Sequence, residues 1–347
     1  MISRRPFLLC AVCALTLGLA APTSAASSEP LRVVATFSIL GDMVSRIGGG
    51  HIALTTLVGP GGDAHVYQPT PAAARAMSEA EVLVVNGLEF EGWLDRLVHA
   101  SEFEGNRIVA TVAIEALPFQ EGDHEDNDEH GNEDHDGHAR HDNDEHDDHA
   151  KHDEDKRESH GDRAGHEDHG HGAFDPHAWL SPRLAVAYVD AITAGLAVAQ
   201  PKLAGAFYAN RAAYVTEIEA LDTEIRTLMA ALPKDARTVV TSHDAFQYFG
   251  RDYELTFLAA QGLSTESEAS AKDVAHLIRQ MRAQNITAAF VENIADPRLL
   301  ERIANETGAA IGGTLYPGAL SGPDGPASTY LDMMRHNART LASALGS

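Results

Sequence analysis

The chain has 347 residues, with 51 Asp or Glu against 26 Lys or Arg and a formal net charge of −25 at pH 7. This acidic balance argues against nucleic acid as a partner. The length and an apolar content of 44% are sufficient for two domains of ordinary size.

Residues 1–25 have the pattern of an export signal. Arg4 and Arg5 precede an apolar run that is too short to span a bilayer, and small residues follow at 23–26. We expect this segment to be cleaved and the mature protein to be periplasmic. Residues 3–8 are also similar to a twin-arginine signature, which implies export in a folded state, and an ordinary secretory signal is the alternative.

Both cysteines, Cys10 and Cys13, lie inside this leader. We therefore expect a mature protein without disulfides or thiolate metal sites. Neither cysteine follows the small residues of a lipoprotein signal, so no lipid anchor is expected. We also expect no later segment to cross a membrane.

From residue 31, short β-branched runs alternate with amphipathic segments, which is the pattern of a parallel α/β lobe. The expected strands are 32–37, 52–58, 82–85 and 108–111, and the expected helices are 39–47, 71–80 and 93–99. Pro71 fits the first turn of its helix.

Residues 121–171 form a tract with twelve of the nineteen histidines and twenty-one Asp or Glu against five Lys or Arg, a local charge of −16. The tract lacks large apolar residues, so we expect a disordered, solvated loop. Its imidazoles and carboxylates predict an accessory collector of metal ions. An acidic solubilising linker is the alternative, but solubility does not require imidazoles. The tract histidines are His124, His130, His135, His138, His141, His146, His149, His152, His160, His166, His169 and His171.

The second half begins with expected helices at 181–199 and 201–232, the latter with an apolar stripe at spacings of three and four residues. The α/β alternation then returns, with expected strands 238–241, 255–258, 288–291 and 309–312 and helices 245–249, 271–284, 297–307 and 329–345.

The predicted fold is α/β, with two parallel-sheet lobes joined by a long rigid helix. We place the N-terminal lobe at 31–200, with the His/Asp-rich loop at 121–172 inserted in it. The linking helix is placed at 201–232 and the C-terminal lobe at 233–347.

Three histidines outside the tract lie where ligands collect in open parallel sheets. His65 and His243 follow expected strands, and His177 precedes an expected helix; His65 and His177 share the local form Asp-x-His. A single histidine is more often structural, but three such positions indicate a shared metal site. We expect the remaining histidines, His51, His99, His276 and His336, at the surface or at helix ends.

Several segments resemble the periplasmic solute-binding proteins of zinc and manganese ABC importers, the ZnuA-like family. They are GDAHVYQPTP at 62–71, NGL at 86–88, DPHAWL at 175–180, TSHDAFQYF at 241–249, GLSTESE at 262–268 and TYLDMMRHN at 329–337. The resemblance covers essentially the whole mature chain. It implies two α/β lobes joined by a rigid helix, one divalent ion between them and a permease partner in the inner membrane.

The resemblance carries ligand roles to His65, His177 and His243. Zinc-binding members are similar to this chain in having histidine at the third position, where manganese-binding members have glutamate, and in carrying a His-rich loop. Imidazole nitrogens suit Zn²⁺, whereas all-oxygen sites suit manganese.

One family feature is absent, because the aspartate ligand of many members aligns with Gly318. Water, a tract histidine, Asp324 or Glu292 are the candidates for the fourth ligand. We expect water first, since zinc held by three histidines with an open position is a known arrangement. An open position can serve hydrolysis, but no substrate pocket is identified in the sequence, so we expect no enzymatic activity.

The expected function is capture of zinc in the periplasm and delivery to a membrane permease by a monomeric protein. A manganese- or iron-binding protein of the same family is one alternative. A periplasmic zinc buffer or metallochaperone is another, and a separate metallochaperone is a further candidate partner.

Overall fold

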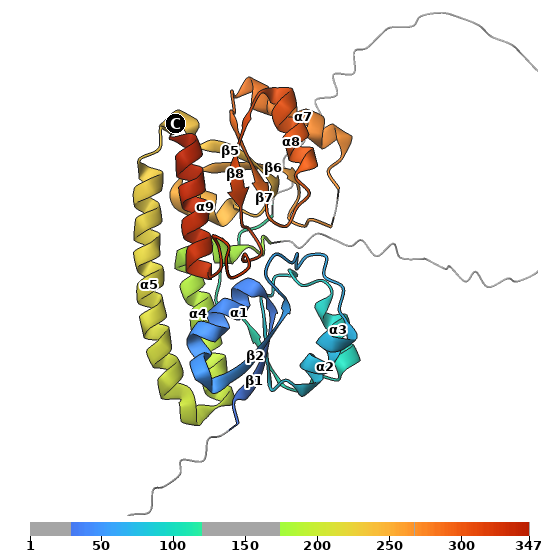
Figure 1. The fold of residues 1–347 in the computed structure, drawn as a ribbon, viewed down its shortest axis with the longest axis vertical. Helices are drawn as coiled ribbons and strands as arrows, with labels where there is room; N and C mark the ends of the chain where they lie inside the picture. The colour runs from blue at the N-terminus through green and yellow to red at the C-terminus, as the bar shows by residue number, and fades with distance from the viewer. Residues whose placement is uncertain (1–28, 120–173, 267, 347) are drawn as a thin grey trace, which may run out of the picture.

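A computed structural model describes residues 29–119, 174–266 and 268–346. The leader and the His-rich tract, with its twelve histidines, therefore lie outside the described residues. The described chain contains two four-stranded parallel sheets, one in each half (Figure 1).

The N-terminal sheet has the strand order β2-β1-β3-β4, with every neighbouring pair parallel. Its strands are β1 (Leu31–Phe37), β2 (Ile52–Val58), β3 (Val82–Val85) and β4 (Asn106–Val109). The helices between them are α1 (Ser38–Gly48), α2 (Pro71–Glu79) and α3 (Leu94–Ser101). The central strand β3 is buried along its whole length, as expected for a parallel sheet covered on both faces.

The C-terminal sheet repeats this order as β6-β5-β7-β8, again all parallel. Its strands are β5 (Thr238–His243), β6 (Thr256–Gln261), β7 (Ala288–Glu292) and β8 (Ala310–Leu315). The helices are α6 (Gln247–Tyr253), α7 (Ala271–Ala283), α8 (Arg298–Thr307) and α9 (Tyr330–Leu345). The predicted fold class is confirmed.

Three edge strands are displaced from their expected positions, and one of them, β8, ends at Leu315, three residues late. Strand β4 begins at the exposed Asn106, two residues early, and β6 extends to Gln261, three residues late. Polar residues are tolerated on edge strands, because one side of the strand is not paired, and a search for apolar runs misses them.

The long helix α5 (Ala204–Ala230) runs beside both lobes (Figure 1). It packs against α1 and α4 (Pro182–Ala199) and also against α6 and α9. Its buried side chains are Phe207, Tyr214, Val215, Ile218, Leu221, Ile225 and Met229. The predicted stripe is thus one continuous face that holds elements of both lobes.

Helix α4 is long and apolar enough to cross a membrane by length and composition, contrary to the expectation from the sequence. Its buried face includes Tyr188, Val189, Ile192 and Leu196, and it packs against α5, α1 and β4. A core helix of a soluble protein passes the same test, so this finding is weak support for a membrane span.

Candidate metal centre

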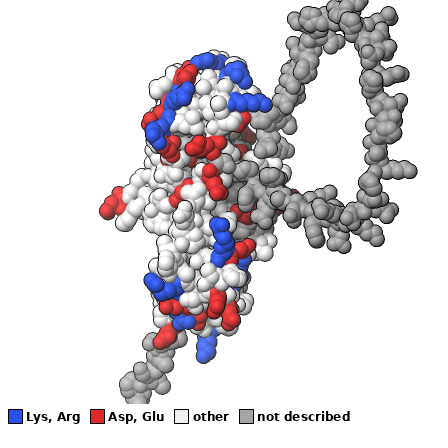
Figure 2. Space-filling view, turned by 90° about the vertical axis from the view of Figure 1, so that its right-hand side faces the viewer, with Lys and Arg blue, Asp and Glu red and all other residues white. Residues whose placement is uncertain are grey.

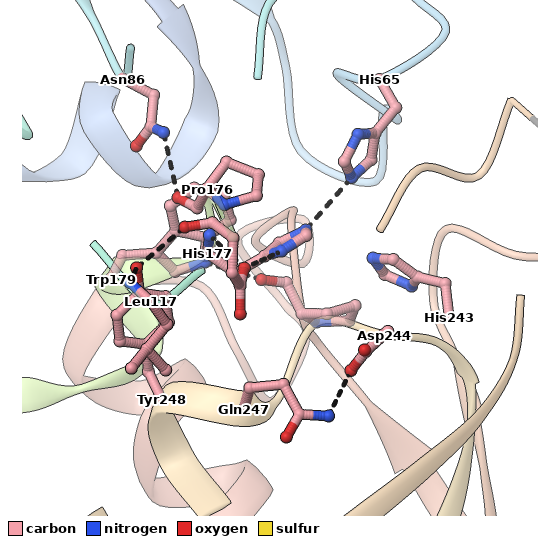
Figure 3. Close-up of polar contacts among 12 residues, drawn as sticks. His65, Asn86, Leu117, Pro176, His177, Trp179, His243, Asp244, Gln247 and Tyr248 are labelled. Carbon is pink, nitrogen blue, oxygen red and sulfur yellow. Dashed lines mark hydrogen bonds and ion pairs between the residues drawn. The ribbon is translucent and has the colours of Figure 1, made fainter. Parts of the chain in front are cut away.

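The three histidines singled out from the sequence come together between the lobes (Figure 3). One ring nitrogen from each of His65, His177 and His243 lies within 4.8 Å of the others. The Nε2 atoms of His65 and His177 are 3.3 Å apart. The side chains reach this point from three segments that are distant in the sequence.

His65 lies on the loop that follows β2. Gly61 adopts a left-handed backbone conformation (φ 71°) in the turn before it, which a residue without a Cβ adopts at little cost. The indole Nε1 of Trp93 donates to the carbonyl of Ala64 at 2.8 Å, and the ring of Phe90 packs edge-on against the imidazole. His65 is half-buried, whereas His177 and His243 are fully buried.

His177 is held by contacts from both lobes. The amide Nδ2 of Asn86, in the N-terminal lobe, donates to the carbonyl of Pro176 at 3.0 Å. The hydroxyl of Tyr248, on α6, donates to the carbonyl of Asp175 at 2.8 Å. The Oδ1 atom of Asp175 accepts the His177 backbone N–H at 2.9 Å and lies 2.8 Å from the ring Nδ1. This leaves the ring Nε2 directed at His65.

His243 is the last residue of β5, and Glu292 is the last residue of the neighbouring strand β7. The Oε1 atom of Glu292 accepts the backbone N–H groups of Ser242 and His243 at 3.0 and 3.1 Å. Its Oε2 atom lies 2.5 Å from Nδ1 of His243. A carboxylate on Nδ1 fixes the tautomer whose Nε2 lone pair is available to a metal.

The site keeps two of its imidazoles neutral. Burial, reinforced by the neighbouring histidines, holds the pKa of His65 and of His177 well below the usual value of 6.5. Burial also acts on His243, but the carboxylate of Glu292 outweighs it and raises the pKa of that imidazole. Neutral imidazole is the form that binds metal, so among the three histidines His243 is the one whose proton competes most with an incoming cation as the pH falls.

Buried carboxylates supply negative charge around the imidazoles. Burial raises the pKa of Asp175 to about 7 and that of Asp244 to about 6, because the ionised form lacks solvation. A bound cation would favour the ionised forms. Figure 2 shows further acidic side chains near the junction of the lobes, on the face that carries α7 and α8.

The arrangement fits a small divalent cation. Nε2 of His243 and Oδ2 of Asp175 are buried without a hydrogen-bond partner among the described residues, which is costly unless something binds there. Two nitrogen ligands that each lie about 2.0–2.1 Å from a tetrahedral zinc ion are about 3.3–3.4 Å apart. The Nε2 atoms of His65 and His177 have this separation. The carboxylates of Asp175 and Glu292, which lie behind the rings of His177 and His243, would balance the charge of the ion.

The suggested protein ligands for the fourth position lie elsewhere. Asp324 is exposed in the turn before α9, and the carboxylate of Glu292 is engaged behind the ring of His243. A Cβ at Gly318 would lie 3.2 Å from Cδ1 of Ile294, so a side chain there would press on an apolar neighbour. Within the described ranges, no Asp, Glu or Cys joins the cluster of three histidines.

The four other described histidines lie outside the cluster. His51, His99 and His276 are exposed, and the ring of the half-buried His336 on α9 contacts the carbonyl of Thr314 at 3.0 Å.

Comparison with known proteins identifies the family. The model of the ZnuA family, described as the zinc-uptake complex component A, periplasmic, matches residues 33–344. The chain belongs to this family. Its members are non-enzymatic periplasmic metal-binding proteins of ABC importers, which implies a permease partner and an extracytoplasmic location.

Curated relatives bind different metals. The chain is 28% identical to the manganese-binding lipoprotein MntA of Halalkalibacterium halodurans, over 91% of this chain and 89% of the relative. It is 27% identical to the iron-binding protein YfeA of Yersinia pestis, over 95% of this chain and 91% of the relative. The solved periplasmic zinc-binding protein TroA of Treponema pallidum superposes with a TM-score of 0.73 at 25% identity, covering 92% of this chain and 99% of that chain.

Sequence reasoning missed the residues behind the imidazoles. The sequence shows Asp175 only as part of an Asp-x-His pattern, and it suggests Glu292 as a direct ligand. The signal that could have found Glu292 is its place at the end of a strand beside β5, where a buried carboxylate requires a partner.

Proposed function

We propose that the chain is the zinc-binding component of its ABC importer and that His65, His177 and His243 are the protein ligands. The observation that carries the proposal is an all-imidazole cluster with carboxylates behind the rings rather than among the ligand atoms. Nitrogen ligands favour zinc, whereas manganese prefers oxygen. The family alone leaves zinc, manganese and iron open.

Water is the proposed fourth ligand. The half-buried edge of the site at His65 is the side from which solvent can reach an ion. The ion is cargo and not a catalytic centre, so an open position serves exchange with solvent and with the permease. This is consistent with a family of binding proteins.

We propose further that residues 1–25 direct export and are then removed, so that zinc is captured in the periplasm. The 121–171 tract would serve as a weak accessory collector that raises the local zinc concentration near the cleft. Its composition and its position in the chain support this role.

Replacing the imidazole of His243 with a carboxylate tests the preference of the site for zinc over manganese. His243→Glu alone would place a carboxylate against Glu292, so the informative variant is His243→Glu/Glu292→Gln, with Glu292→Gln as its control. We expect the double variant to lose at least about tenfold in the ratio of zinc to manganese affinity relative to the control. Competition titrations with a metal-sensitive dye measure both affinities. Wild-type protein that prefers manganese or iron(II) over zinc would contradict the proposal and favour the other metals of the family.

A further inference from the structure

The loop that carries His65 makes a polar contact with the opposite lobe through Asp63. Oδ1 of Asp63 accepts the backbone N–H of His65 at 2.9 Å. Its other oxygen, Oδ2, accepts the hydroxyl of Thr265 at 2.5 Å. Asp63 follows β2 in the N-terminal sheet, whereas Thr265 follows β6 in the C-terminal sheet. One carboxylate therefore joins a ligand-bearing loop to the other lobe.

The segment that presents Thr265 is itself tied to the third histidine. The backbone N–H of Asp244, next to His243, donates to the carbonyl of Gly262 at 3.0 Å. The hydroxyl oxygen of Ser264 accepts the N–H of Glu266 at 3.1 Å, which orders the turn around Thr265. A short path of backbone and hydrogen bonds thus leads from His243 through the 262–266 turn to Asp63 and His65.

The three histidines differ in how firmly they are held. His177 and His243 are fully buried, and each has a carboxylate on its ring Nδ1. His65 is half-buried. The polar contacts that hold its loop include the two bonds of Asp63, the Trp93 bond to the carbonyl of Ala64 and the bond from the Gly61 N–H to the carbonyl of Leu320 at 2.8 Å. The least buried histidine is therefore also the one without a carboxylate on its ring among the described residues, and its loop is held in part by contact with the other lobe.

We propose that Asp63 is a positioning residue that keeps His65 in the metal site while the lobes are in contact, with Thr265 as its partner. The inference rests on the proposed ligand role of His65. When the lobes separate at the 262–266 turn, the carboxylate loses its Thr265 bond, the loop gains freedom and one of three ligands can leave. Asp63 then controls how long the metal stays bound.

The test is the rate at which zinc leaves the full chain. The protein is loaded with one equivalent of zinc, and an excess of chelator is added by rapid mixing. The rate is taken from the kinetic phase of zinc release that is absent in a His65→Ala variant, because this phase reports on the site with the three histidines. Thr265→Val keeps the shape of the side chain but removes the hydroxyl, and Thr265→Ser retains it. We expect Thr265→Val to accelerate release about three- to tenfold and Thr265→Ser to stay within about twofold of wild type.

A double-mutant cycle separates coupling from general loosening. Asp63→Ala removes both bonds and should accelerate release at least as much as Thr265→Val, and adding Thr265→Val to Asp63→Ala should change nothing further. Unchanged release in Thr265→Val, or independent effects of the two substitutions, would overturn the coupling. A wild-type protein that binds no divalent ion would instead overturn the proposed function.

Discussion

Two Asp-x-His segments have the same sequence pattern but act differently at the level of single residues. Asp175 contacts both the backbone N–H and the ring of His177, whereas Asp63 contacts the backbone of His65 and a hydroxyl of the other lobe. The pattern predicted that both histidines belong to one site. It could not predict which atoms each carboxylate would face, because that depends on segments far away in the chain.

The raised pKa of His243 makes zinc binding dependent on pH in a defined way. Below pH 6.5, His243 holds a proton that zinc must displace, whereas His65 and His177 remain neutral. The dissociation constant should therefore rise by at least about tenfold per pH unit as the pH falls from 6.5 to 5.5, with one proton from His243 and further protons from the buried Asp175 and Asp244, whose pKa values are raised to about 7 and about 6. Competition titrations across this range give the slope.

Glu292→Gln is the matched variant for this measurement. It removes the carboxylate that raises the pKa of His243, so the slope between pH 6.5 and 5.5 should become shallower while affinity at pH 7.5 falls about 10- to 100-fold. An unchanged slope in the variant would show that protonation of His243 is not governed by Glu292.

At the level of secondary-structure elements, the spacing of apolar residues predicted each strand of the two sheets and each helix that connects them. This was possible because apolar residues recur at different intervals in buried strands and in amphipathic helices. The edge strands β4, β6 and β8 were displaced, since polar residues or glycines lie near their ends. The pairing of α5 with helices of both lobes rests on buried apolar side chains. Its ion pairs, such as Arg46 with Glu217, are substantially exposed and contribute at most about 1 kcal/mol each.

Close packing of α4 on the N-terminal sheet can be tested at one glycine. A Cβ at Gly195 would lie 2.2 Å from Cδ1 of Ile108 on β4, so Gly195→Ala should destabilise the protein by about 1–3 kcal/mol despite the better helix propensity of alanine. Gly205 on α5 has no atom within 4 Å of such a Cβ, and Gly205→Ala is the control, neutral or stabilising by up to about 1 kcal/mol. Thermal melting compares the two, and equal melting temperatures for the two variants would contradict the packing argument.

At the level of the whole molecule, the two lobes enclose the site from opposite sides, and the long helix α5 packs against both (Figure 1). The sequence predicted this architecture and the three histidines because both follow from local pattern and from resemblance to the family. The carboxylates behind the rings and the Asp63–Thr265 contact require the lobes to be placed together, which no local pattern encodes.

The central claim is that one tight zinc site resides in the cleft and not in the tract. The most direct measurement is metal content and competitive zinc affinity of three proteins. They are the mature chain, a form lacking residues 121–171, and the chain with His65→Ala, His177→Ala and His243→Ala. We predict one tight zinc ion that survives deletion of the tract and disappears in the triple variant. Tight binding that leaves with the tract and persists in the triple variant would contradict the account and would make the protein a zinc buffer.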